Sequence, residues 1–348
     1  MNINILQWRY STFLIIFLLW LWLPIESAQA FPLSSVDCTA SMRTNPINIG
    51  STITPDNAGR ASIDATLEYS CKNRGFFSGY VSVCLAAKGG DNSTVTNPRY
   101  LTNSTDETST LPFNMTLPGG SIWGTRTNSG SEYQGSQLYL PGLVFGSPTK
   151  SDSVTITVSL LSSEKNTFPT SGTYTNFFGG GSATLIYDTD NSDSNCATAI
   201  QGTKPFTFTV QATVIDSCKI TASPGIIDLG SYSASETNTI KGNGAIGVTC
   251  TNTTPYNIGL APSNGSTTGA GVMRGTASNT DKVPYQLRSS TGLSGAVWGN
   301  TATSTSVGNG VNGTGSGGVQ NKTVYVTVPS ADFKPDNYSD TVTINVNY

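Results

Sequence analysis

The sequence repeats itself, and this internal duplication limits the folds that the chain can adopt. Each half opens on a cysteine, Cys38 or Cys218, and then has a strand that ends on a second cysteine, Cys71 or Cys250. Further short runs follow in both halves, with apolar and polar residues in alternation and with glycine and asparagine between the runs. Such alternation is typical of β-strands with one buried face. Several short strands per half predict an all-β protein with two β-sandwich domains in tandem.

The composition excludes several classes of function. Charged residues make up only 11% of the chain, the net charge is −3, and no basic cluster stands out, so nucleic acid is not expected as a partner. Histidine is absent, which leaves no Ser–His or Cys–His pair for catalysis. We therefore expect no enzymatic activity and no cofactor.

The first residues have the features of a secretory signal peptide. Arg9 precedes an apolar run from Phe13 to Leu23, and the small residues Ala28 and Ala30 follow. A basic start, a short apolar core and an A-x-A end are the parts of such a signal. The alternative is a retained anchor, for which the run is short. We therefore expect residues 1–30 to be removed and the protein to be exported.

An even number of cysteines in an exported chain predicts disulfides. The repeat makes two pairs equivalent and leaves a third, so the predicted disulfides are Cys38–Cys71, Cys218–Cys250 and Cys84–Cys196. Metal binding is the competing interpretation, but the sequence has neither a C-x-x-C motif nor a histidine. No metal site is expected.

The most regular strand lies between the halves, from Phe206 to Val214, where apolar and polar residues alternate without a break. One of its faces must be buried. Because it leads directly to Cys218, it can begin the second domain; because it follows the first half, it can also complete the first domain. Both possibilities stay open. We place the domains at residues 31–203 and 204–348.

The second half resembles a known family in several motifs. The stretches ATVIDSC, IDLGSY, IGVTC and VPYQL and the final YSDTVTINVNY are similar to the spore coat U family of pilin-like domains, over nearly all of residues 205–348. The first half resembles the same family more loosely. Two such domains behind one signal peptide are similar to the two-domain tip adhesins of archaic chaperone–usher pili.

This resemblance implies an immunoglobulin-like sandwich whose C-terminal domain lacks its last strand. A periplasmic chaperone, and then a pilin subunit at the outer-membrane usher, would supply that strand. The acceptor groove would be lined by the final apolar residues, Val342, Ile344, Val346 and Tyr348. A self-complete sandwich is the alternative. Because only Phe31 to Asp37 precede Cys38, without an alternating apolar run, we expect this chain to end a fibre rather than to extend one as a shaft pilin.

Three stretches of the first half are apolar where the second half has polar loops. They contain Phe76, Phe77 and Tyr80; Leu138, Tyr139, Leu140, Leu143, Val144 and Phe145; and Phe177 and Phe178. Loops are normally polar, and exposed apolar patches mark binding surfaces. The resemblance implies that such loop tips attach cells, from the pilus tip at the cell surface, to hydrophobic and abiotic surfaces in biofilm formation. Each stretch could instead be buried, and a sugar-binding pilus lectin on the same fold is the other functional interpretation.

Overall fold

The computed structural model describes residues 35–348, apart from 128–129, 145, 147, 162–167, 191–194, 199, 224 and 277. The predicted signal peptide and Phe145 lie outside the described residues. Within the described part the chain consists of strands and one 3-10 turn, η1 (Ala58–Arg60). No helix there is long and apolar enough to cross a membrane. The prediction of an all-β protein is confirmed.

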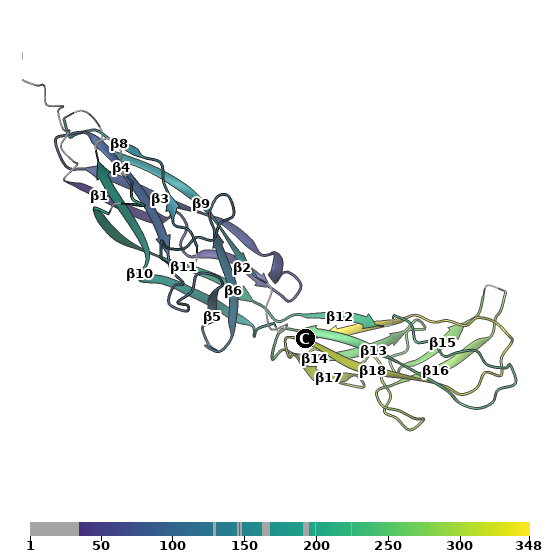
Figure 1. Cartoon of the computed structure of the whole chain (residues 1–348). Helices are drawn as coiled ribbons and strands as arrows, with labels where there is room; N and C mark the ends of the chain where they lie inside the picture. Colours follow the sequence, from purple (N-terminus) through teal and green to yellow (C-terminus); the bar gives the residue numbers. More distant parts are fainter. Residues whose placement is uncertain are drawn as a thin grey trace, which may run out of the picture.

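The strands form two elongated domains that lie end to end, each with its own hydrophobic core (Figure 1). One layer of the first domain has the strand order β1 (Val36–Met42), β3 (Ser62–Asn73), β9 (Thr149–Leu160), β6 (Thr110–Thr116), β5 (Arg99–Asn103). The facing layer contains β4 (Gly79–Ala87), β10 (Gly172–Asp190), β11 (Gly202–Val214) and β2 (Ile47–Ile53), with the short β7 (Tyr133–Gln134) and β8 (Leu138–Leu140) paired to β4.

The second domain repeats this arrangement with fewer strands. Its larger sheet has the order β12 (Cys218–Ser223), β13 (Ile240–Cys250), β18 (Val319–Val328), β16 (Lys282–Arg288), β15 (Ala270–Arg274). The facing sheet has the order β17 (Val311–Thr314), β14 (Pro255–Pro262), β19 (Val342–Asn347). One tryptophan anchors each sandwich in the same way, because the indole Nε1 of Trp123 donates to the Leu85 carbonyl at 2.9 Å and that of Trp298 to the Ile258 carbonyl at 2.8 Å.

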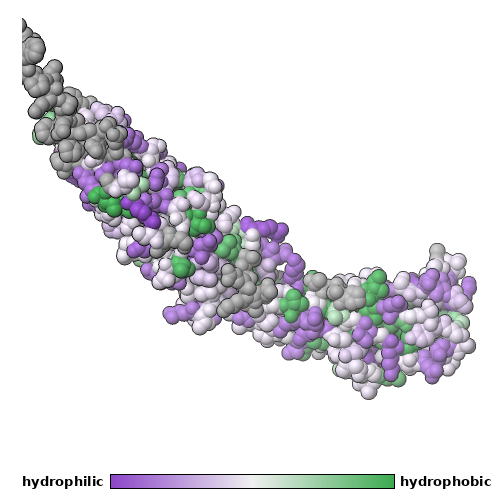
Figure 2. All heavy atoms as spheres, viewed as in Figure 1, coloured by the Kyte–Doolittle hydropathy of each residue, from purple (hydrophilic) through white to green (hydrophobic). Residues whose placement is uncertain are grey.

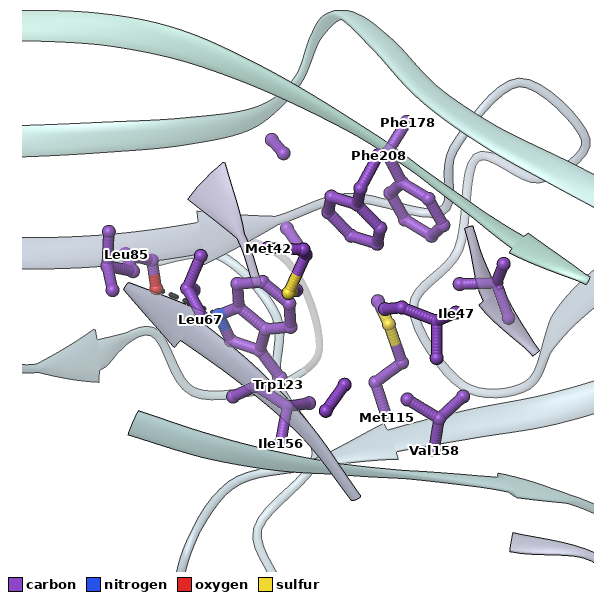
Figure 3. Close-up of a cluster of buried hydrophobic side chains, with 14 of the residues drawn as sticks. Met42, Ile47, Leu67, Leu85, Met115, Trp123, Ile156, Val158, Phe178 and Phe208 are labelled. Atoms are coloured by element: carbon purple, nitrogen blue, oxygen red, sulfur yellow. Dashed lines mark hydrogen bonds between the residues drawn. The ribbon is translucent and has the colours of Figure 1, made fainter. Parts of the chain in front are cut away.

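The strand between the halves belongs to the first domain. β11 runs antiparallel to β10 and parallel to β2, and its inward side chains are at most 6% exposed. Phe208 stacks on Phe178 with 4.4 Å between ring centroids and lies 6.0 Å from the Trp123 ring (Figure 3). The sequence left two roles open for this segment, and the structure gives it the role of completing the first sandwich. β11, up to Val214, therefore packs with the first domain, although it lies beyond the predicted boundary at residue 203.

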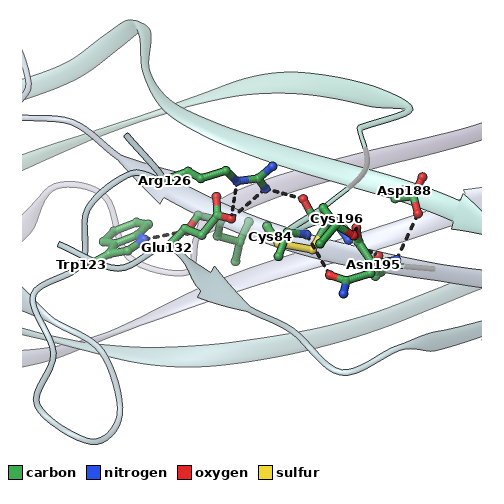
Figure 4. Close-up of a disulfide and its surroundings, with 11 residues drawn as sticks. Cys84, Trp123, Arg126, Glu132, Asp188, Asn195 and Cys196 are labelled. Atoms are coloured by element: carbon green, nitrogen blue, oxygen red, sulfur yellow. Dashed lines mark hydrogen bonds and ion pairs between the residues drawn. A yellow bond between two sulfur atoms is a disulfide. The ribbon is translucent and has the colours of Figure 1, made fainter. Parts of the chain in front are cut away.

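The three predicted disulfides are present. Cys38–Cys71 joins directly paired residues of β1 and β3, and Cys218–Cys250 joins directly paired residues of β12 and β13. Cys84–Cys196 ties β4 to the chain between β10 and β11 (Figure 4). Arg126 lies beside this bond, where it pairs with Glu132 at 2.7 Å and donates to the Cys196 carbonyl. The third disulfide thus fixes the segment that leads into β11.

Backbone contacts join the two domains. The amide of Phe168 donates to the Gly317 carbonyl at 2.7 Å, and the amide of Asn252 donates to the Pro169 carbonyl at 3.2 Å. Lys219 and Asp56 add an exposed ion pair at 2.6 Å. The loop between β9 and β10 therefore marks the end of the first domain that faces the second.

Candidate binding surfaces

Two of the predicted apolar stretches meet at the far end of the first domain. β8 pairs with β4 so that Tyr139 lies opposite Tyr80 and Leu140 opposite Gly79. This register brings the loop after β3 beside the loop after β8, at the end that faces away from the second domain (Figure 1). We call residues 74–80 and 138–144 the distal tip.

A buried asparagine at the end of β3 holds the distal tip together. The side-chain amide of Asn73 donates to the Phe77 carbonyl at 2.7 Å and to the Pro141 carbonyl at 3.3 Å, while its oxygen accepts from the Gly75 amide at 2.8 Å. The loops also approach closely at Gly142, where an added Cβ would lie 1.9 Å from the Phe76 carbonyl oxygen. A side chain at this position would push the loops apart, so glycine is required there.

The distal tip exposes large apolar side chains on this fixed backbone. Phe76, Phe77, Tyr139, Leu143 and Val144 are between 47% and 70% exposed. Tyr80 and Leu138 are half-buried, and the rings of Tyr80 and Tyr139 lie beside each other with 5.3 Å between their centroids. In the space-filling view the exposed apolar residues form separate patches among hydrophilic ones (Figure 2). An apolar patch presented on rigid loops is a candidate binding surface.

Other parts of the predicted surface are wrong. Leu140 and Phe178 are fully buried, because each occupies an inward position of its strand. Phe177, the outward neighbour of Phe178, is 45% exposed but pairs with Thr209 near the middle of β11. The part of β10 that reaches the distal tip is its last residue, which pairs with Tyr80. The third stretch is therefore a strand on the side of the domain and not a loop at its end.

Two residues near this surface have no signal in the sequence that predicts their role. Asn73 looked like an ordinary polar residue between a strand and a turn, and nothing in the sequence signalled its burial. Ile200 is 59% exposed beside Gln201, whose amide donates to the Tyr187 carbonyl of β10. A single apolar residue in a polar linker gives no periodic signal.

The charged groups at the base of the distal tip are mostly basic. Asp37 of β1 accepts from Arg74 at 2.7 Å and lies 3.6 Å from Lys204. The hydrogen bond from Arg74 and the charge of Lys204 hold the pKa of Asp37 below its usual value. This carboxylate therefore stays ionised and already has partners.

A buried arginine of the first domain, Arg99, stabilises the fold. Arg99 is fully buried, and its guanidinium donates to the backbone carbonyls of Lys88, Thr96, Ala87 and Trp123. Burial lowers the pKa of Arg99 to about 9. These bonds fix the loop after β4. Within the described residues, no group of three or more histidine, cysteine, aspartate or glutamate side chains could hold a metal ion.

The second candidate surface is the free edge of β19. Within the described part of the chain β19 pairs with β14 alone, whereas β10, its counterpart, also pairs with β11. Leu85 and Ile258 occupy equivalent positions, because the carbonyl of each accepts a hydrogen bond from the buried tryptophan of its domain. On the neighbouring strand, Leu85 pairs in register with Leu185 of β10, and Ile258 pairs with Val346 of β19. Leu185 is fully buried, while Val346 is half-buried. The difference is the cover that β11 gives to the first domain.

The other predicted groove residues have similar exposure. Val342 and Ile344 are half-buried and Tyr348 is 51% exposed. The segment 225–230, which corresponds to β2, forms no strand. Within it, Ile227 and Leu229 lie over Gly242 and Gly244 of β13, where an added Cβ would come within 2.8 Å or less of their side chains. In the described part of the second domain, no strand pairs with β19 in the way that β11 pairs with β10 in the first domain.

Residues 204–345 match the family model of the Spore Coat Protein U domain, which confirms the resemblance predicted for the second half. A search of curated protein sequences finds no match.

Several solved structures show some likeness to the chain. The complex of the chaperone CsuC with the tip adhesion subunit CsuE, from archaic chaperone-usher Csu pili of Acinetobacter baumannii, is 13% identical, with a TM-score of 0.46 over 90% of this chain and 100% of that one. CfaE, the adhesive subunit of CFA/I fimbria of enterotoxigenic Escherichia coli, is 10% identical, with a TM-score of 0.31 over 87% of this chain and 93% of that one. The CssB subunit complemented with a donor strand from CssA, also from enterotoxigenic Escherichia coli, is 15% identical, with a TM-score of 0.23 over 53% of this chain and 100% of that one.

Proposed function

We propose that this protein is the tip adhesin subunit of an archaic chaperone–usher pilus. The first domain attaches cells to hydrophobic, including abiotic, surfaces through the distal tip and promotes biofilm formation. The second domain joins the fibre by accepting a β-strand from a pilin subunit, after a periplasmic chaperone has held the same groove and the outer-membrane usher has exported the complex.

One observation carries this proposal: the two copies of the fold differ in completeness. The first is completed by β11 from its own chain and exposes an apolar tip. The second has a free strand edge beside half-buried apolar side chains. A sandwich with an open apolar groove needs a partner, and an extended strand is the partner that satisfies both the edge and the groove.

Adhesion by the distal tip follows from area burial. Covering one large exposed side chain contributes about 1.5–3 kcal/mol. The backbone of the loops is already fixed by Asn73, so little ordering opposes the contact. Several exposed side chains acting together give one molecule a weak affinity for the surface. Many fibres on one cell bind at the same time, so the cell as a whole attaches with high avidity.

The experiment is cell adhesion to polystyrene with a variant in which Phe76, Phe77 and Val144 are all replaced by serine. Removing each large contact should weaken single-molecule attachment roughly tenfold or more. The matched control replaces Leu293 and Val297, exposed apolar residues of the second domain, with serine. Loss of adhesion in the tip variant only, with normal fibre assembly, supports the proposal. Full adhesion in the tip variant would refute the role of the distal tip.

A further inference from the structure

The side chains of the distal tip are arranged in order of polarity along the domain axis. Phe76 and Phe77 lie in the loop, and Val144 lies in the neighbouring loop. The contacting pair Tyr80 and Tyr139 comes next, each at the second position of its strand. Aliphatic and phenyl groups at the extremity with tyrosine rings behind them match the depth profile of a lipid interface, where tyrosine prefers the headgroup level.

Basic side chains complete this order. The segments 72–80 and 138–150 contain Lys72, Arg74 and Lys150 and no acidic residue. Lys72 and Lys150 are exposed, on neighbouring strands at the base of the loops. Asp37 of β1, which pairs in register with Lys72, is engaged by Arg74 and Lys204. One acid does reach the tip from the neighbouring strand, since Asp190, the last residue of β10, pairs in register with Tyr80. In a chain with only 11% charged residues, three basic residues in these two segments are still a specific feature.

We propose that the distal tip inserts into anionic lipid bilayers. This inference rests on the proposed function, in which the same side chains make the adhesive contact, and it names a lipid surface as a partner. Phe76, Phe77 and Val144 enter the acyl boundary, the two tyrosines lie among the headgroups, and Lys72 and Lys150 contact lipid phosphates.

The geometry favours a bilayer over a neutral apolar solid. On a neutral solid only the buried apolar area contributes to the binding free energy, and the two exposed lysines contribute nothing. Near an anionic leaflet each lysine adds to the binding free energy. β10 brings one acid to the tip, because Asp190 at its end pairs in register with Tyr80 of β4, while the next acid, Asp188, pairs with Ser82 further from the tip. The basic edge of β3 and β9 should therefore approach the headgroups more closely than the β10 edge.

The experiment is flotation of the full mature chain with phosphatidylcholine vesicles, with and without about 30% phosphatidylglycerol. We expect binding to the anionic vesicles that weakens as salt is added. Replacing Lys72 and Lys150 with glutamine should weaken this binding about fivefold for each lysine. The matched control, Lys241→Gln with Lys282→Gln, removes two exposed lysines of the second domain and should bind like the parent.

Adhesion to polystyrene, measured on the same variants, separates the two proposals. The lysine variant should bind anionic vesicles more weakly but adhere to polystyrene like the parent. The variant with Phe76→Ser and Phe77→Ser should lose both vesicle binding and polystyrene adhesion. Intact polystyrene adhesion without vesicle binding would overturn the lipid inference and leave the proposed function standing. Equal binding to neutral and anionic vesicles would overturn it too.

Discussion

Replacing Asn73 with alanine should disorder the distal tip while the sandwich stays folded. The side chain makes three hydrogen bonds, two to loop carbonyls and one from the Gly75 amide. At about 1 kcal/mol each, their loss destabilises the closed loops by about 2–3 kcal/mol. Local opening of the two loops should become roughly 30- to 150-fold more frequent. The affected bonds lie at one end of the domain, so global unfolding should change less.

Hydrogen exchange measured by mass spectrometry tests this expectation, together with adhesion to polystyrene. Amides of residues 74–80 and 141–144 should exchange faster in Asn73→Ala, and adhesion should fall with them. Asn103→Ala is the matched control, because Asn103 is equally buried and accepts from the Thr105 amide at 2.9 Å and donates to the Ser171 carbonyl at 3.2 Å, at the end that faces the second domain. Unchanged exchange and adhesion in Asn73→Ala would refute the idea of a clamped tip.

Three further predictions concern stability. Phe208→Ala removes a fully buried ring stacked on its neighbours and should cost about 3–5 kcal/mol in urea unfolding of the first domain, whereas Thr207→Ala on the outer face should change it by less than about 0.5 kcal/mol. Replacing both members of Cys84–Cys196, which are 112 residues apart, with alanine should cost about 4–5 kcal/mol; an unchanged melting temperature would contradict this. Hydrogen bonds, chiefly from Asn279, lower the pKa of Asp336 to about 2 from 3.8, so its stabilising effect should be complete above pH 3.8 and disappear as the pH falls through 2; Asp336→Asn should show no such step in acid melting curves.

Much of the fold could be predicted from the sequence, because period-two alternation and paired cysteines are local signals. The repeat predicted the tandem sandwiches, and the equivalent cysteines predicted two disulfides and left the third pair by elimination. The membership of β11 could not be predicted, since its buried face fits either domain. Only its pairing with β10 and β2 decides.

The candidate surface was predicted in part, for a related reason. Phe76, Phe77 and Val144 lie in loops, where apolar residues have no strand face to fill, and they are exposed. Leu140 ends β8 and Phe178 lies within β10, and both occupy inward positions, where a short apolar run looks the same in the sequence whether it is buried or not. Their burial depends on what packs opposite, which for Phe178 is Phe208 from a distant part of the sequence.

The most direct test of the account concerns the open edge of β19. We would append a flexible linker and a copy of residues 203–214 after Tyr348, so that the copy can fold back antiparallel to β19 as β11 does on β10. The control carries the same extension with serine in place of the residues copied from Phe206, Phe208 and Val210. We expect amide exchange in residues 342–347 to slow strongly with the apolar extension and to stay fast with the control. The account would be contradicted if, in the unextended chain, residues 342–347 already exchanged as slowly as β10 and if the apolar extension did not slow them further.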